Sequence, residues 1–308
     1  MKIAILITSF KRPELLAMQL EFLTKTKYRI YISQDVDSED QSRYSEEVIK
    51  CIELINENSQ LVHKSLVYAS PQGCYKGVSN AINWAFENED ALIIIEDDVL
   101  VSDEYINFAE AMLTEYRYDK KIGSICAMNL VPGNMIWNQS LTHRLSIFTS
   151  SWGWATWKDR WSLFLNDVET DEISRIVPKI NHSFQVYWLR IFNETYSGLN
   201  DSWAYRWLYT NWMYGMYSIV PNRNLGLNLG FGESSTHTSD RELPWWLPLE
   251  IHRNYRWDMT TPLTVDHHAD TWMMRNHFVI SEFSNLKNYM RKRFPKCYLI
   301  YSKYKNRH

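Results

Sequence analysis

The sequence predicts an α/β fold with a mostly parallel central sheet flanked by helices. Short apolar runs, typical of strands buried on both faces, alternate with amphipathic segments of helical period along the first third of the chain. The 308 residues are 45% hydrophobic and 22% charged, which excludes disordered, collagen-like and coiled-coil proteins. Without a visible linker or repeat, we expect one domain over 1–285, with halves at 1–120 and 121–285, and a C-terminal tail at 286–308.

The expected elements follow in chain order. Strands are predicted at 2–8, 28–33, 65–69 and 91–95, and helices at 13–26, 42–57 and 77–88. Pro13 suits the first turn of its helix, where a missing N–H costs nothing. Beyond residue 120 the pattern becomes irregular and tryptophan becomes frequent.

Composition also bears on location and partners. The four cysteines have neither metal-site nor disulfide spacing, and no segment approaches the ~20 apolar residues of a membrane span. From Lys287 onward the chain has eight Lys/Arg and no acid, whereas the other residues carry 25 Lys/Arg against 36 Asp/Glu. The acidic excess of the residues before Lys287 would repel a nucleic-acid backbone, which disfavours nucleic acid as a partner. We predict a cytoplasmic protein, whose tail either contacts the anionic inner membrane peripherally or is a solvated helix.

The sharpest chemical feature is Glu96-Asp97-Asp98, directly after the apolar run 91–95. Acids at this position emerge at the carboxyl edge of the sheet, where ligands bind in α/β folds. Alternation predicts Glu96 and Asp98 on one side and Asp97 on the other. A hard divalent cation whose shell is completed by substrate phosphates suits such a cluster. The alternative is an acidic turn before a helix that begins near Ser102.

Several short motifs occur in the order and approximate spacing of glycosyltransferase family 13, the N-acetylglucosaminyltransferase I type. They are Ile32-Ser33-Gln34-Asp35, Gly73-Cys74-Tyr75-Lys76, the 93–98 run, Ser124-Ile125-Cys126-Ala127-Met128-Asn129, Trp152-Gly153-Trp154 and Gly230 to His237. The 151–157 and 201–207 segments also resemble bacterial family 2-like sugar transferases. The resemblance covers roughly residues 1–240.

The resemblance implies a GT-A fold and inverting, Mn²⁺-dependent (or Mg²⁺-dependent) transfer from UDP-GlcNAc or a related UDP-sugar to a glycan or glycolipid. In a cytoplasmic protein, synthesis of a bacterial surface polysaccharide such as lipopolysaccharide is the natural setting. By this resemblance Asp35 recognises uracil and Asp98 binds the metal. Asn80 falls near a family histidine that is absent here. The expected nucleotide-sugar residues are Thr8, Ser9, Arg12, Asp35, Lys76, Asn80, Glu96 and Asp97.

Asp201 is the predicted base that accepts the acceptor's proton. It precedes an expected helix, so the competing interpretation is an N-cap. The other candidate carboxylates are Asp159, Asp167, Asp171 and Glu194. Trp154, beside Gly153, is predicted to contact a sugar, while Trp157, Trp161, Trp203, Trp207 and Trp212 are expected in the core. His237 is a second metal ligand, a hydrogen-bond donor to phosphate or an ordinary loop residue.

Two other functions remain open. A sugar-nucleotide nucleotidyltransferase would carry an early glycine-rich phosphate loop, but Ser9-Phe10-Lys11-Arg12-Pro13 contains no glycine. A non-catalytic carbohydrate-binding protein would have no need of three adjacent acids after a buried strand.

Overall fold

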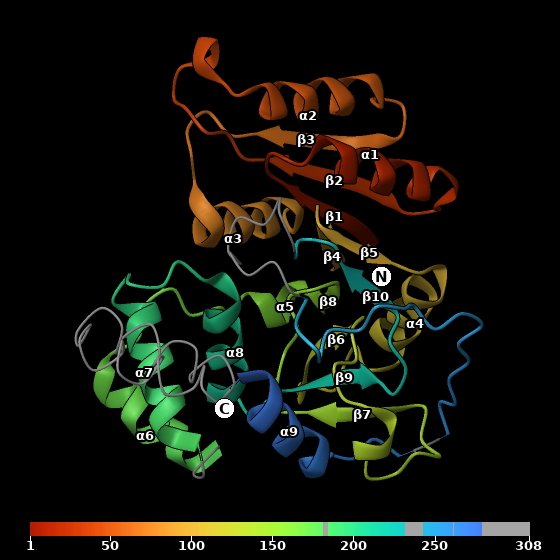
Figure 1. Ribbon diagram of the computed structural model, residues 1–308, viewed down its shortest axis with the longest axis vertical. Coiled ribbons are helices and arrows are strands. Elements are labelled where there is room, and N and C mark those ends of the chain that lie inside the picture. The colour runs from red at the N-terminus through yellow and green to blue at the C-terminus, as the bar shows by residue number, and fades with distance from the viewer. Residues whose placement is uncertain (181–183, 232–242, 261, 279–308) are drawn as a thin grey trace, which may run out of the picture.

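The structure is a computed structural model, described here for residues 1–180, 184–231, 243–260 and 262–278. It confirms the α/β class, but its eight-stranded sheet is mixed rather than mostly parallel (Figure 1). The strand order is β3-β2-β1-β4-β8-β6-β9-β7. Its strands are β1 (Ile3–Ser9), β2 (Arg29–Gln34), β3 (Val62–Val67), β4 (Ala91–Glu96), β6 (Ile122–Cys126), β7 (His143–Ser146), β8 (Trp154–Trp157) and β9 (Tyr217–Pro221).

The first four strands form the expected parallel block, in which β1 pairs with both β2 and β4. Strand β8 then inserts antiparallel between β4 and β6. Strands β6 and β9 are parallel, and β7 closes the sheet antiparallel to β9. Because β8 lies next to β4, strands of both predicted halves belong to one sheet.

Two helix layers cover the parallel block, as its continuous apolar strands predict. Ile5, Ile7 and Ile93 contribute to a core on one face with α1 (Pro13–Phe22), α2 (Glu46–Glu57) and α4 (Asp103–Glu115). The alternate residues Leu6 and Ile94 face α3 (Gly73–Ala85) and α8 (Trp203–Met213). The alternation of side chains along each strand separates the two cores.

The remaining elements build the second half. The helices α6 (Thr170–Ile180) and α7 (Gln185–Tyr196) pack with α8 into a helical group, green in Figure 1. Shorter elements are β5 (Val99–Val101), β10 (Gly226–Asn228), α5 (Lys158–Trp161), α9 (His267–Met273), a π-helical turn at Met274–Phe278 and 3-10 turns at Leu23–Lys25, Gln41–Arg43 and Gly133–Met135. Among the described residues, no helix combines the length and apolarity needed to cross a bilayer.

The tryptophans predicted for the core are there. Trp157, Trp161, Trp203, Trp207 and Trp212 are all buried. Trp154, predicted to contact a sugar, is fully buried as well and stacks on Trp203 with ring centroids 5.3 Å apart. Gly153 has a φ of +71°, and a Cβ there would lie 2.8 Å from Val101 Cγ1. The Trp152–Gly153–Trp154 turn is therefore shaped by close packing.

Candidate functional site: an acidic cleft beside an aromatic cleft

A cleft of about 580 Å³ opens at the carboxyl ends of β1, β2 and β4, a size typical of small-molecule sites. Six carboxylates and one arginine side chain face it. The residues that line it are Thr8, Ser9, Phe10, Arg12, Ser33, Asp35, Val36, Asp37, Tyr68, Pro71, Gly73, Cys74, Gly77, Val78, Glu96, Asp97, Asp98 and Asp201. Except for Asp201, all of these come from the first hundred residues.

The Arg12 guanidinium holds two of the three acids, Asp97 and Asp98. Asp97 is only 3% exposed and accepts hydrogen bonds from the Phe10 N–H and from Arg12 Nη1, both at 2.6 Å. Arg12 Nη2 also lies 3.2 Å from Asp98 Oδ2. Glu96 turns toward α8, where its Oε1 accepts a hydrogen bond from the Trp203 indole at 3.3 Å. Arg12 thus contacts both Asp97 and Asp98, and Glu96 has a separate partner.

One positive charge does not balance these three acids. Burial, together with the charges of Asp98 and Asp97, raises the pKa of Glu96 to about 8. Burial and the Asp98 charge raise the pKa of Asp97 to about 7, although Arg12 opposes this shift. The cluster therefore holds protons near neutral pH that a bound cation would displace.

The first turn of α3 lies at the mouth of the cleft and carries two carboxylates. Asp35 accepts hydrogen bonds from the backbone N–H groups of Gln72 and Gly73, at 3.0 and 3.1 Å. Asp201 accepts from the next two amides, those of Cys74 at 2.9 Å and Tyr75 at 3.4 Å. These are the amides that a helix leaves without intrahelical partners.

Asp201 therefore caps a helix, but not the one that the sequence suggests. The cap of α8 is Ser202, whose hydroxyl accepts the Tyr205 N–H at 3.3 Å. Asp201 instead extends to α3, more than 120 residues earlier in the chain. Gly73 permits this approach, since its φ is +74° and a Cβ there would lie 2.8 Å from Asp201 Oδ2.

A backbone segment from the second half passes over the acid triplet. The Leu229 N–H donates to the Asp98 carbonyl at 2.7 Å. A Cβ on Gly230 would lie 2.0 Å from Asp98 Oδ2, so only a glycine fits beside that carboxylate in this arrangement. The Gly230 N–H donates to the Asn228 side chain at 2.7 Å, which fixes the segment in place.

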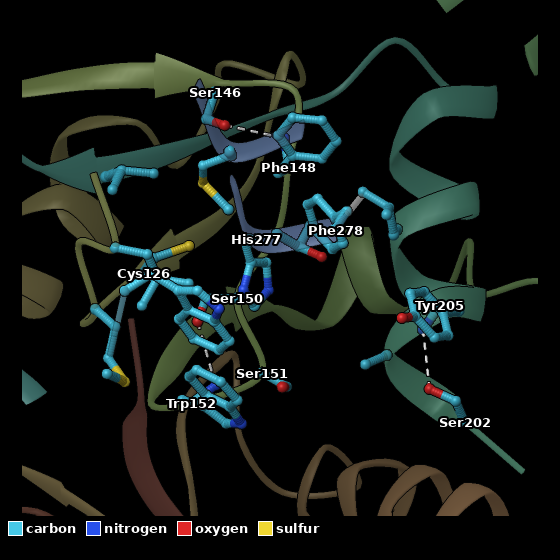
Figure 2. Close-up of a pocket in the computed structure, with 18 of the residues that line it drawn as sticks. Cys126, Ser146, Phe148, Ser150, Ser151, Trp152, Ser202, Tyr205, His277 and Phe278 are labelled. Carbon is cyan, nitrogen blue, oxygen red and sulfur yellow. Dashed lines mark hydrogen bonds between the residues drawn. The ribbon is translucent and has the colours of Figure 1, made fainter. Parts of the chain in front are cut away.

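A second cleft, of about 480 Å³, lies on the other side of the start of α8, where Ser202 lines it. Figure 2 shows Trp152 and Ser151 on one side of it, Tyr205 and Ser202 of α8 on the other, and His277 between. Among the described residues that line it there is no carboxylate. We refer to it as the aromatic cleft and to the first as the acidic cleft.

Aromatic rings shape this second cleft. The rings of Trp152 and Trp246 are within 7° of parallel with centroids 6.2 Å apart, and His277 meets the Trp246 ring edge-on at 4.2 Å. Burial lowers the pKa of His277 to about 4, so this imidazole is neutral at physiological pH. Asp201 lines the acidic cleft and Ser202 the aromatic cleft, so the start of α8 contributes a residue to each.

Most of the predicted donor residues meet in one place. Thr8, Ser9, Arg12, Asp35, Glu96, Asp97, Asp98 and Asp201 all line the acidic cleft. Lys76 and Asn80 are exposed on α3 and do not line it. Trp154 and Gly153 line neither cleft, because both are packed inside the fold. His237 lies outside the described residues.

The rival base candidates lie elsewhere. Asp159 pairs with Lys120 and Arg160, and Glu194 lies 3.4 Å from Arg190. Asp167 and Asp171 are exposed, and none of these four carboxylates lines either cleft.

Sequence reasoning missed Trp152, Trp246 and His277 as cleft residues. Trp152 precedes the predicted Gly153–Trp154 pair, and its orientation depends on the turn at Gly153. Trp246 and His277 reach the cleft only through packing with distant segments. No local pattern in the sequence marks them.

No protein-family profile matches the sequence, and comparison with curated protein sequences also gives no match. Among solved structures, the chain is similar to S. aureus TarS, with 12% identity and a TM-score of 0.42 over 73% of this chain and 36% of that one. It is also similar to S. aureus TarS 1-349, with 11% identity and a TM-score of 0.44 over 75% of this chain and 61% of that one. A197 from STIV matches with 11% identity and a TM-score of 0.28 over 53% and 68%. This chain thus spans between about a third and three fifths of the TarS chains, and similarity this remote does not identify an activity.

Proposed function

We propose that this protein is an inverting glycosyltransferase that moves a sugar from a UDP-sugar, such as UDP-GlcNAc, to a hydroxyl group of a glycan or glycolipid. One observation carries the proposal: Asp201 lines an acidic, nucleotide-sized cleft, and its neighbour Ser202 lines an aromatic cleft whose described residues include no carboxylate. A transferase needs a charged donor site and a sugar-binding acceptor site that meet at a proton acceptor.

The acidic cleft suits the donor with its cation. Its acids exceed its positive charge, as the raised pKa values of Glu96 and Asp97 indicate. Among the described residues, no three His, Cys, Asp or Glu side chains are placed so that they could hold one metal ion together. That part of the chain therefore has no metal site made by protein ligands alone. Mn²⁺ or Mg²⁺ bound with a nucleotide does not need one, because phosphates complete its shell.

Asp98 is the residue that would hold the ion, since its carboxylate lines the cleft and is partly exposed. When bound, the ion would neutralise the leaving diphosphate as a Lewis acid. Arg12 orients the Asp98 carboxylate and adds a second positive charge beside the phosphates. Asp35 keeps the start of α3 in place at the mouth of the cleft.

Asp201 is the proposed base. The two amide hydrogen bonds from α3 hold its carboxylate in the acidic cleft and leave lone pairs free for an acceptor hydroxyl. An acceptor sugar would enter through the aromatic cleft, where its C–H face packs against Trp152 or Trp246 and its hydroxyls bond with Ser150, Ser151 or Tyr205.

The test begins with binding. Titration calorimetry with UDP and Mn²⁺ should show binding to the wild type that is lost in Asp98→Asn. Asp103→Asn is the matched control, since Asp103 is exposed in the first turn of α4 and lines neither cleft. Mn²⁺-independent binding of UDP, unchanged in Asp98→Asn, would contradict the metal role.

Turnover tests the base. Asp201→Asn should bind UDP and Mn²⁺ as the wild type does, while UDP release from a UDP-sugar with acceptor glycans falls by about 10²–10⁴-fold. Full turnover by this variant would refute the role of Asp201. Binding of glycans by a wild type that neither binds UDP nor turns over any donor would identify a carbohydrate-binding protein instead.

We place the reaction in synthesis of a bacterial surface glycan such as lipopolysaccharide, because a cytoplasmic transferase with a basic tail can meet a lipid-linked acceptor there. The tail at 286–308 lies outside the described residues.

A further inference from the structure

Large apolar side chains are exposed beside α9 and on the segment that packs against it at Trp272. Trp137 is 82% exposed, Leu243 is 51% exposed and Trp245 is 64% exposed. These three residues, together with the half-buried Trp272 on α9, are called the α9 patch. Clustered exposure of large apolar side chains marks interaction surfaces in soluble proteins.

The α9 patch is firmly held from beneath. The Trp137 N–H donates to Asp266 Oδ2 at 2.9 Å, and Asp266 also caps α9 through its other oxygen. The Trp245 ring packs edge-on against Trp272, with centroids 5.9 Å apart. Ile136 and Ala269 form a buried cluster with Trp272 packed against it. The exposed indoles therefore project from a fixed base and not from a loose loop.

The segment that carries Trp245 divides its side chains between two environments. Leu247 is buried, and Trp246 lines the aromatic cleft. Trp245, between these inward positions and the exposed Leu243, points to solvent. The segment thus turns Trp246 and Leu247 inward and leaves Trp245 exposed.

The chain that follows this surface is strongly basic. Helix α9 continues into the turn that ends at Phe278, and the sequence from Lys287 to His308 then contains eight Lys/Arg and no acid. Indole rings prefer the interface between headgroups and acyl chains. Nearby Lys/Arg residues are attracted to anionic lipid headgroups. Stable peripheral binding takes two such signals together.

We propose that the α9 patch is a membrane-docking surface that inserts Trp137 and Trp245 into the interface of an anionic bilayer. The patch is independent of the donor chemistry, so this inference stands apart from the proposed function. One consequence does rest on that function: Trp245 in the bilayer and Trp246 in the aromatic cleft would place this cleft beside a lipid-linked acceptor.

The test is vesicle co-sedimentation of the full-length chain with phosphatidylcholine vesicles, with and without phosphatidylglycerol. The wild type should bind the anionic vesicles more strongly than the neutral ones. Trp137→Ser combined with Trp245→Ser should weaken binding to anionic vesicles by about tenfold, because indole area is no longer removed from water. A chain truncated after Leu286 should lose the preference for anionic lipid.

Tyr118→Ser combined with Leu199→Ser is the matched control, since these side chains are 80% and 82% exposed, follow α4 and α7 in the chain and are not part of the α9 patch. It should bind vesicles as the wild type does. Circular dichroism checks that each variant is folded. Wild-type binding by the double-tryptophan variant would overturn the proposal. Analytical ultracentrifugation gives a second way to overturn it. If the wild type is a dimer and the double-tryptophan variant is a monomer, a second copy of the chain covers the patch.

Discussion

Replacement of Gly230 by alanine should disable the acidic cleft while leaving the fold intact. A Cβ at this position would lie 2.0 Å from Asp98 Oδ2 and 2.8 Å from Asp98 Cγ. The carboxylate would have to move by about 1.4 Å to regain ordinary contact at 3.4 Å. Arg12 Nη2 lies 3.2 Å from the same oxygen, so such a movement would disturb this ion pair.

The magnitude follows from this displacement. Misplacement of a reacting group by about 1 Å can cost about 10²-fold in rate, which corresponds to about 2.7 kcal/mol of lost transition-state stabilisation. We expect a loss of that order in turnover of the UDP-sugar, together with weaker Mn²⁺-dependent binding of UDP. The melting temperature without ligand should change little, because residue 230 is in a partly exposed segment outside the core.

Gly133→Ala serves as the matched control. Among the residues that the structure describes, a Cβ on Gly133 meets only the end of the Arg223 side chain, at the ordinary distance of 3.7 Å. Titration calorimetry with UDP and Mn²⁺, followed by an assay of UDP release, compares the two variants. Equal binding and turnover in Gly230→Ala and Gly133→Ala would show that the Asp98 carboxylate does not act where we place it.

Two further predictions concern stability. Burial raises the pKa of Asp270 to about 6, well above its usual value of 3.8. Since the folded pKa is the higher one, the stabilisation from protonated Asp270 is complete below about pH 4 and is lost as the pH rises through 6. Urea unfolding should therefore show the wild type losing up to about 3 kcal/mol relative to Asp270→Asn over this range, and parallel pH profiles would refute the assignment. A Cβ on Gly123 in β6 would lie 1.9 Å from Asn211 Oδ1 in the buried part of α8, so Gly123→Ala should cost about 1–3 kcal/mol through overpacking. Chemical denaturation with an unchanged midpoint would contradict this expectation.

The sequence could predict the elements whose signal is local. The apolar run at 91–95 became β4, and Pro13 begins α1, as expected. Boundaries were less accurate where distant residues decide them. The helix expected at 77–88 begins at Gly73 because the carboxylates of Asp35 and Asp201 accept its first amide hydrogens.

The mixed sheet could not be predicted in the same way. Strand β8 is only four residues long, and its sequence, Trp-Ala-Thr-Trp, does not differ from the tryptophan-rich segments on either side of it. No local signal therefore marks it as a strand. Its place between β4 and β6 depends on pairing with both neighbours. Without that pairing, the apolar runs predict only a parallel sheet.

In the candidate site, too, residues with a local signal could be predicted and residues placed by distant packing could not. Glu96, Asp97 and Asp98 follow a recognisable strand, so their place at the sheet edge was predictable. Trp152 and Trp154 both flank Gly153, and the sequence does not show which indole faces inward. The structure buries Trp154 and leaves Trp152 at the aromatic cleft.

The reach of Asp201 to α3 has a consequence for engineering by exchange of parts. Every described residue of the acidic cleft except Asp201 comes from the first hundred positions, which makes that portion look transplantable. A fragment cut at residue 120 would nevertheless leave the Cys74 and Tyr75 amides without their carboxylate and expose β4 as an open edge, a template for aggregation. A chimera that grafts a foreign acceptor half onto this one must therefore supply both an aspartate at the start of the equivalent of α8 and a strand that pairs antiparallel with β4.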